Sequence, residues 1–381
     1  MRKADNIDAI PEYLREITDT QILNAKKLQT ASTFSFLFYT DSHITDMSSF
    51  ADLHTINYIN RNMELEFTAC CGDNLDNNFT KTQHLETASR LIDTFTFDNF
   101  FTVKGNHDDN SFMSEGTDNI KYTMLPREQY EIMFHKMEGL VNFDTSNQYG
   151  LYYYYDIPQY KVRAVFLNSI DIPYLPDPAM PAAWKYAGQS TYAYSNSQLN
   201  WLAHTALNLP DPAWNVILFT HINPFNEDMI GADNLAHNSL VLTEIVDAFK
   251  KGISYNSVPT AGDFAQAVSV DFTDRGKGNV LAFFYGHTHS EQVLYRNDIP
   301  YISTWNDCPK KPLSNPEAPA RTAGTTSEIC LNIVTVDLEQ NKIFMTKIGA
   351  GDDLKIRLKE IDVFQEEQVA DKIPSAPVEK K

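Results

Sequence analysis

Short apolar runs alternate with longer amphipathic stretches along the first third of the chain. The runs have the length of buried strands, and the amphipathic stretches repeat apolar residues at helical spacing. The pattern predicts a helix within residues 7–28 that breaks near 18–20, strands over 32–40, 66–71 and 100–104, and helices over 50–63 and 82–95. Strands that alternate with helices are typical of βαβ units, in which helices cover the faces of a parallel or mixed sheet.

The rest of the chain is richer in strand pairs and loops. Its predicted elements are a hairpin of 151–157 and 162–168, a helix from about 197, a strand over 216–220, a helix over 240–250, a strand over 280–285, and closing antiparallel strands over 292–296, 301–305, 329–338 and 342–348. This second half therefore predicts further strands that complete a large α/β domain.

These elements divide the chain into three segments. We expect a helical N-terminal extension over 1–30, one domain over 31–350, and a C-terminal segment over 351–381 that becomes a loose tail from about residue 365. Two insertions interrupt the domain. One, at 171–195, is rich in Pro, Ala and Tyr, and the other, at 306–327, is rich in Pro and Thr.

The composition is that of an ordinary globular protein, with 43% hydrophobic and 21% charged residues. Lys and Arg number 31 against 50 Asp and Glu, so the formal net charge is −19. Because such an acidic surface repels phosphate backbones and anionic lipids, we expect neither long nucleic acid nor a membrane as a partner. No segment approaches the roughly 18 consecutive apolar residues of a membrane span. The pattern specifies no oligomeric state.

The four cysteines are too few for a disulfide framework. We expect Cys70 and Cys71 to be buried on opposite faces of a strand. Cys308 and Cys330 are expected to be free thiols, with a disulfide between them as the alternative. The N-terminal residues lack the apolar core of a signal peptide. We therefore expect a cytoplasmic protein, and the alternative is a secreted or surface protein whose signal peptide has been removed.

Five of the predicted strands end in polar clusters that share histidine, aspartate and asparagine. The clusters are Asp41-Ser42-His43, Gly72-Asp73-Asn74-Leu75-Asp76, Gly105-Asn106-His107-Asp108, Thr220-His221 and Gly286-His287-Thr288-His289. Ligands of open α/β sheets bind beyond the carboxyl ends of the strands. We therefore expect these clusters to converge at one edge, although they are far apart in sequence.

The residue types in these clusters predict metal binding. Imidazoles, carboxylates and an amide oxygen form a mixed nitrogen and oxygen ligand set, which suits Mn, Fe or Zn better than Mg or Ca. The ligands are too many for one tetrahedral ion. Their number fits two ions that share a bridging carboxylate, an arrangement suited to displacement at phosphorus. Such a site needs no serine or cysteine nucleophile.

The ordered set of motifs D-x-H, G-D-x-x-[DN], G-N-H-[DE], H and G-H-x-H, spread over about residues 30–290, resembles the calcineurin-like metallophosphoesterase superfamily. The stretch 197–202 also resembles the helix that precedes the fourth motif in many members. The resemblance implies a four-layer αββα sandwich of the α/β class, in which helices flank two mixed β-sheets. It makes 31–350 the catalytic domain.

The resemblance also implies roles for individual residues. Asp73 would bridge two divalent ions. The other ligands would be Asp41, His43 and His289 for the first ion and Asn106, His221 and His287 for the second. His107 would protonate the leaving group with help from Asp108, while a hydroxide that bridges the metals attacks phosphorus.

Single residues also have other interpretations. Asp41 could cap the helix that follows it, and for Asp76 we favour capping or support of the ligands. His204 and His237 compete with His221 for the fourth motif. Only His221 follows a strand-like apolar run, so we prefer it.

The implied function is that of a dinuclear metal-dependent phosphohydrolase acting on small phosphate esters. A phosphodiester such as a cyclic nucleotide is favoured, because acid assistance by a histidine suits an alkoxide leaving group. The alternatives are a phosphomonoesterase or nucleotidase and, from another class, a non-catalytic metal-binding scaffold. Two divalent ions beside the carboxylates of Asp41 and Asp73 would leave the pocket at about +2. We expect the two insertions and the loops 106–124 and 222–238 to set specificity.

Overall fold

The apolar run Thr33–Tyr39 forms strand β1, all seven residues of which are buried. The computed structural model describes residues 10–45, 48, 50–78, 80–225, 235–308, 318–358 and 371–373. The first sheet has the strand order β16 (Asp371–Ile373), β15 (Asp353–Arg357), β14 (Lys342–Gly349), β13 (Cys330–Asp337), β1, β2 (Thr68–Cys70) and β3 (Phe100–Thr102). Only β1, β2 and β3 run parallel, so their carboxyl ends meet at one edge.

The second sheet differs from the first in having its parallel strands in the centre and antiparallel strands at both edges. Its order is β11 (Gln292–Arg296), β12 (Ile299–Ser303), β10 (Asn279–Phe284), β7 (Asn215–Phe219), β6 (Val162–Phe166), β5 (Tyr153–Ile157) and β4 (Asn142–Phe143). The strands β6, β7, β10 and β12 are parallel. Separately, β8 (Ser254–Asn256) pairs with β9 (Ser269–Asp271).

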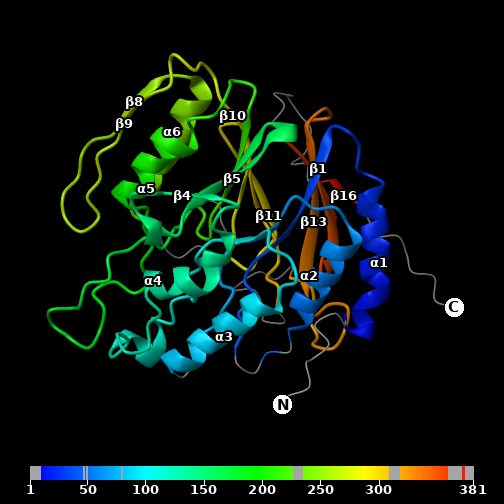
Figure 1. Ribbon diagram of the computed structural model, residues 1–381, viewed down its shortest axis with the longest axis horizontal. Coiled ribbons are helices and arrows are strands. Elements are labelled where there is room, and N and C mark those ends of the chain that lie inside the picture. Colours follow the sequence, from blue (N-terminus) through cyan, green and yellow to red (C-terminus); the bar gives the residue numbers. More distant parts are fainter. Residues whose placement is uncertain are drawn as a thin grey trace.

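Helices cover the outer faces of the two sheets and complete four layers (Figure 1). They are α1 (Glu12–Lys26), α2 (Ala51–Asn62), α3 (Lys81–Thr94), α4 (Pro126–Gln129), α5 (Asn196–Trp201) and α6 (Ser239–Lys251). Shorter turns of 3-10 helix occur at 113–116, 135–137, 148–150 and 158–160, and π turns at 130–134 and 202–206. The helices α1 and α2 lie beside the first sheet, and α5 and α6 lie beside the second. The predicted four-layer α/β sandwich is confirmed.

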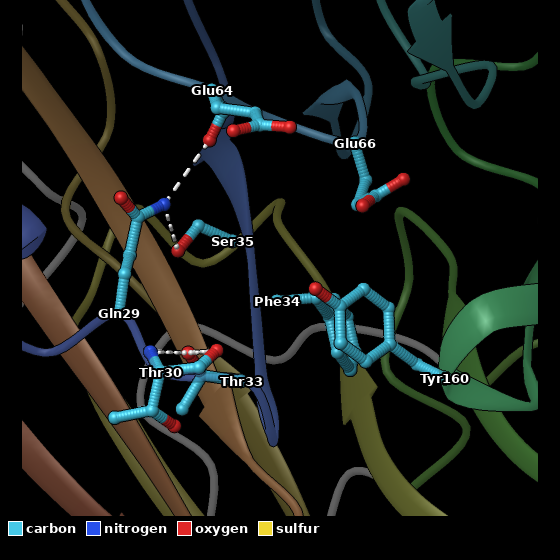
Figure 2. Close-up of a pocket in the computed structure, with 8 residues that line it drawn as sticks. All are labelled: Gln29, Thr30, Thr33, Phe34, Ser35, Glu64, Glu66 and Tyr160. Atoms are coloured by element: carbon cyan, nitrogen blue, oxygen red, sulfur yellow. Dashed lines mark hydrogen bonds between the residues drawn. The ribbon is translucent and has the colours of Figure 1, made fainter.

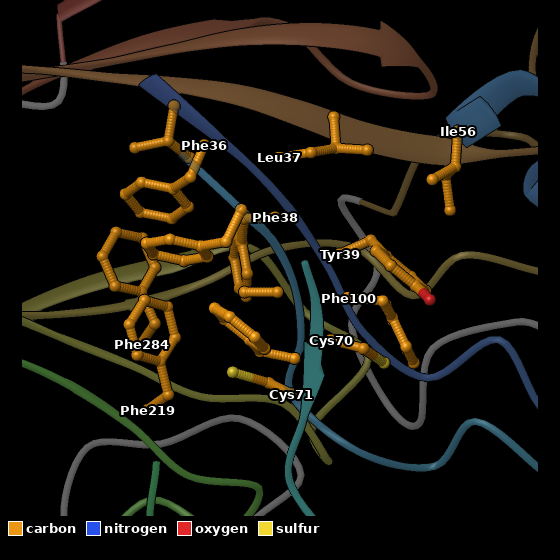
Figure 3. Packing of buried hydrophobic residues seen from close by; sticks show 14 of the residues in the cluster. Phe36, Leu37, Phe38, Tyr39, Ile56, Cys70, Cys71, Phe100, Phe219 and Phe284 are labelled. Atoms are coloured by element: carbon orange, nitrogen blue, oxygen red, sulfur yellow. The ribbon is translucent and has the colours of Figure 1, made fainter. Parts of the chain in front are cut away.

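Aromatic side chains fill the space between the sheets (Figure 3). Phe36 of β1 contacts Phe219 and Phe284 of the second sheet edge-on, with ring centroids 5.7 and 5.5 Å apart. Phe38 lies 4.9 Å from Phe284 in the same manner. Edge-to-face geometry adds to the free energy of burial. This contact fixes how β1 sits against β7 and β10, and all three strands end in predicted ligands.

The opposite face of β1 packs toward the helices. Leu37 and Tyr39 point toward Ile56 of α2 and Phe100 of β3 (Figure 3). The tyrosine ring lies 6.5 Å from the Phe100 ring. All four cysteines of the chain are buried and free, which confirms the expectation of unpaired thiols.

The predicted break in the first helix is wrong, because α1 runs without interruption through residues 18–20. Thr18 and Thr20 donate their hydroxyl hydrogens to the carbonyl oxygens of Leu14 and Glu16, at 2.6 and 2.9 Å. Threonine hydroxyls bonded in this way are accommodated inside a helix. These two residues therefore do not end it.

Both predicted terminal segments contribute to the first sheet's side of the molecule. Gln21 of α1 donates to the carbonyl oxygen of Lys347 in β14 at 2.7 Å. Asp371–Ile373, within the predicted loose tail, pairs with β15. The rest of that tail lies outside the described residues, as do 1–9, 226–234 and 309–317. Within the described part of the chain, no helix has both the length and the apolar character that a bilayer span requires.

A cavity of about 220 Å³ lies at the amino-terminal end of β1, away from the strand end that carries Asp41 (Figure 2). It is lined by Gln29, Thr30, Thr33, Phe34, Ser35, Glu64, Glu66 and Tyr160. Gln29 donates to the hydroxyl of Ser35 and to the carbonyl oxygen of Glu64. The lining polar groups thus bond to one another.

The contact between the sheets predicts a large stability difference between two phenylalanine variants. Phe36→Ala should lower the free energy of unfolding by about 3–5 kcal/mol, since it removes a fully buried ring from the inter-sheet core. Phe112→Ala is the matched control, because Phe112 is 48% exposed, and it should change stability by less than about 0.5 kcal/mol. Denaturant unfolding of both variants checks this, and equal losses would contradict the proposed core.

Candidate metal centre

Five of the seven predicted metal ligands have left-handed backbone at or near the end of a strand. The φ angles are 58° for Asp41, 47° for His43, 49° for Asp73, 70° for His287 and 50° for His289. For a residue other than glycine this conformation costs roughly 1–3 kcal/mol and persists only where the surroundings enforce it. Here it turns the chain sharply at the edge where the strands end.

Two glycines allow these turns to approach one another. A Cβ on Gly105 would lie 1.9 Å from the backbone nitrogen of Asp73, and one on Gly286 would lie 2.1 Å from Oγ1 of Thr40. Both distances are far below van der Waals contact. Glycine at these positions therefore lets the third and fifth motifs pack against the second and first.

The first ligand group is Asp41, His43 and His289, whose donor atoms all lie within 4.8 Å of one another. Oδ2 of Asp41 accepts from the hydroxyl of Thr40 and the backbone N–H of His287. Its Oδ1 is buried and has no hydrogen-bond partner among the described residues. The two imidazole Nε2 atoms lie only 2.9 Å apart. An orphaned carboxylate oxygen facing two crowded imidazole nitrogens fits a cation between them.

The titration behaviour of this group suits metal binding. Burial alone would raise the pKa of Asp41, but the imidazoles of His289 and His221 lower that pKa to about 2. Burial lowers the pKa of His43 to about 3. The carboxylate is therefore ionised and the imidazole of His43 neutral, which are the forms that bind metals.

The second group combines Asp73, His221 and His287 with the amide of Asn106. Oδ1 of Asn106 lies 2.8 Å from Nε2 of His221 and 2.9 Å from Nδ1 of His287. Nδ1 of His221 lies 2.7 Å from the carbonyl oxygen of Cys71 and donates to it. Such a bond orients an imidazole so that its other nitrogen faces a metal.

Asp73 lies between the two groups. Its Oδ2 is 3.7 Å from Nε2 of His43 and 3.5 Å from Nε2 of His221. Burial would raise the pKa of Asp73, but the imidazoles of His221 and His107 hold that pKa well below its usual value. The same attraction overcomes the effect of burial on His221 and raises its pKa to about 9. Metal binding at His221 would therefore release a proton.

His107 stands beside both groups with its two nitrogens in different surroundings. Nδ1 lies 3.2 Å from Oδ1 of Asp76. The predicted helper, Asp108, instead accepts from the backbone N–H groups of Gly105 and Leu75 at 2.7 and 2.9 Å. The carboxylate of Asp76 therefore lies beside His107, where the resemblance led us to expect Asp108. The Asp108 carboxylate is held in its own loop by the two backbone N–H groups.

A buried histidine outside the motifs supports the same loop. His84 donates from Nε2 to the carbonyl oxygen of Asp108 at 2.9 Å and accepts at Nδ1 from Asn78. The sequence signal was its place on the apolar face of α3, where Ala88 and Leu91 are also buried. His204 and His237, the competitors of His221, belong to neither ligand group.

The two groups predict separable metal losses. We expect the wild-type protein to bind about two divalent ions per chain. His289→Ala should lose one ion and His287→Ala the other, whereas Asp73→Asn should weaken both sites. His135→Ala is the control, since that side chain is 64% exposed and lies in neither group. Elemental analysis after dialysis measures the ratio, and an unchanged ratio in all three site variants would contradict these ligand groups.

The structure is similar to several solved structures of other proteins. The structure is similar to GAP50, the anchor in the inner membrane complex of Plasmodium, with 13% identity over 87% of this chain and 90% of that one and a TM-score of 0.44. It is also similar to a protein assigned as a 5′-nucleotidase from Staphylococcus aureus, with 13% identity and a TM-score of 0.38. The match covers 88% of this chain and 56% of that one. The phosphopantetheinyl hydrolase of Mycobacterium tuberculosis matches with 12% identity and a TM-score of 0.31, over 73% of this chain and 91% of that one.

The search of curated proteins found no match. The sequence model described as calcineurin-like phosphoesterase matches residues 34–291, a range that contains all five polar clusters. The chain therefore belongs to the calcineurin-like phosphoesterase family.

Proposed function

We propose that the protein is a dinuclear metal-dependent phosphohydrolase that cleaves small phosphate esters. The observation that supports this most strongly is the position of the Asp73 carboxylate between two groups of imidazoles, with His107 beside it. When bound, two divalent cations would lower the pKa of water toward neutrality and stabilise charge on the phosphoryl group. Mn, Fe and Zn all suit the mixed ligand set.

His107 is the proposed general acid. Its Nε2 lies 4.0 Å from Oδ2 of Asp73, so this nitrogen faces the edge where the ligands converge. On the other side of the ring, Nδ1 lies 3.2 Å from Oδ1 of Asp76 and 3.1 Å from the amide nitrogen of Asn77. In this proposal the Nε2 proton passes to the leaving-group oxygen as its bond to phosphorus breaks.

A small phosphodiester, such as a cyclic nucleotide, is the favoured substrate. Its alkoxide leaving group gains most from a proton donor. The two cations and the carboxylates of Asp41 and Asp73 sum to about +2 before a hydroxide binds. With the hydroxide the pocket carries about +1, which matches the single negative charge of a diester. The net charge of −19 opposes long polyanions. A phosphomonoesterase or nucleotidase is the alternative within the same chemistry.

The proposed function predicts hydrolysis by the metal-loaded protein. Purified protein with added Mn should hydrolyse bis(4-nitrophenyl) phosphate or 4-nitrophenyl phosphate, and the ratio of the two rates separates diesterase from monoesterase. The Asp73→Asn variant is the control. A protein that binds metal but hydrolyses neither ester would instead be a metal-binding scaffold, and the proposal would be wrong.

The general acid predicts a selective effect of one substitution. His107→Ala should lower kcat/KM about 10²–10⁴-fold for alkyl esters, which need a proton, and much less for nitrophenyl esters, whose leaving group needs none. Steady-state rates with both ester types check this. Equal losses with both would count against the acid role.

The different surroundings of Asp76 and Asp108 predict different consequences of their substitution. Asp76→Asn should reproduce the selective loss of His107→Ala with little change in stability. Asp108→Asn should lower thermal stability, because it weakens the bonds to two buried backbone N–H groups. Melting temperatures and the alkyl-to-nitrophenyl rate ratio of both variants distinguish them. The reverse pattern would restore Asp108 as the partner of His107.

A further inference from the structure

The insertion at 171–195 is fastened to the loop that carries His107. The hydroxyl of Tyr174 donates to Oδ2 of Asp109 at 2.6 Å, and Nζ of Lys104 donates to the Tyr174 oxygen at 2.5 Å. Nζ of Lys104 also lies 3.4 Å from Oδ2 of Asp109. Lys104 and Asp109 are both buried, and they flank the motif that runs from residue 105 to 108. A buried ion pair with a shared hydroxyl holds its partners in one geometry.

Further contacts bring the same insertion close to this loop. A Cβ on Gly188 would lie 2.4 Å from Oδ2 of Asp109, so the backbone of the insertion rests directly on that carboxylate. The indole N–H of Trp184 donates to the hydroxyl of Thr123 at 2.8 Å. The insertion is therefore held in place by these contacts and forms one wall of the candidate active site.

This wall places the amide of Gln189 next to the proposed acid. Nε2 of Gln189 lies 3.4 Å from Nε2 of His107. The hydroxyl of Tyr192 donates to the carbonyl oxygen of Gln189 at 3.2 Å and holds the backbone there. Because Asp76 occupies the Nδ1 side of His107, Gln189 faces the nitrogen that would release the proton.

The Gln189 amide keeps unused hydrogen-bonding capacity in this position. Its Oε1 is buried and has no hydrogen-bond partner among the described residues. The amide nitrogen of Gln189 carries two N–H groups, so it can contact Nε2 of His107 and still donate to a second acceptor. An oxygen atom that lies beside both nitrogens can bond to both, because it has two lone pairs.

We propose that Gln189 binds the leaving-group oxygen of the substrate. The inference rests on the proposed function. As the P–O bond breaks, His107 transfers its Nε2 proton to this oxygen, and Gln189 donates a hydrogen bond without giving up a proton. The hydrogen bond strengthens as negative charge develops, so it stabilises the transition state more than the bound ester. The insertion therefore contributes directly to selection among leaving groups.

The test compares substitutions at two glutamines. Gln189→Leu keeps the approximate volume and removes both hydrogen-bonding groups. Gln159→Leu is the matched control, because Gln159 is exposed and its amide donates to Oε1 of Glu66, a residue that lines the cavity in Figure 2. Gln189→Ala replaces the leucine variant if that protein does not fold. Metal content and melting temperature are measured for each.

A series of aryl and alkyl phosphates gives the decisive measurement, in whichever ester class the wild-type protein hydrolyses faster. Gln189→Leu should lower kcat/KM about 10- to 100-fold for alkyl esters and less than about 3-fold for nitrophenyl esters, the range for a hydrogen bond to a charged group. Gln159→Leu should leave both rates unchanged. The inference is wrong, while the proposed function stands, if the wild-type protein is active and Gln189→Leu either lowers kcat/KM equally for all esters or leaves it unchanged for all of them. A wild-type protein that hydrolyses no ester overturns both.

Discussion

The aromatic packing between the two sheets is the constraint on which the candidate site depends. Predicted ligands follow β1, β2 and β3 in one sheet and β7 and β10 in the other, so neither sheet alone supplies either complete ligand group. The rings of Phe36, Phe219 and Phe284 fix the separation of these sheets. Two hydrogen bonds then join them at the edge. One runs from His221 to the carbonyl oxygen of Cys71, and the other from the backbone of His287 to Asp41.

Burial leaves the donor atoms at this edge in need of charged partners. Carboxylates and imidazoles removed from water need charged or hydrogen-bonded partners. Oδ1 of Asp41 has no hydrogen-bond partner among the described residues, and its carboxyl pKa is held at about 2 by nearby imidazoles. The strained backbone of five predicted ligands and the buried donor atoms are costs that divalent cations would offset. With two such cations bound, an acidic protein would present a locally cationic pocket.

The sequence alone identified the strand ends, because each motif follows an apolar run and the carboxyl ends of parallel strands share an edge. It also predicted the two mixed sheets and their helices. It could not decide whether Asp76 or Asp108 lies beside His107, since that depends on which side chain turns back onto its own loop. It could not indicate Gln189, which reaches His107 only through the fold of a long insertion. The break expected in α1 was wrong, because two threonine hydroxyls bond within the helix.

Anomalous diffraction from a crystal of the Mn-loaded protein tests the central claim most directly. Two Mn peaks about 3.5–4 Å apart are expected on either side of the Asp73 carboxylate, one near Asp41 and His289 and the other near Asn106 and His221. A single peak, or peaks away from Asp73, would contradict a dinuclear centre bridged by this residue.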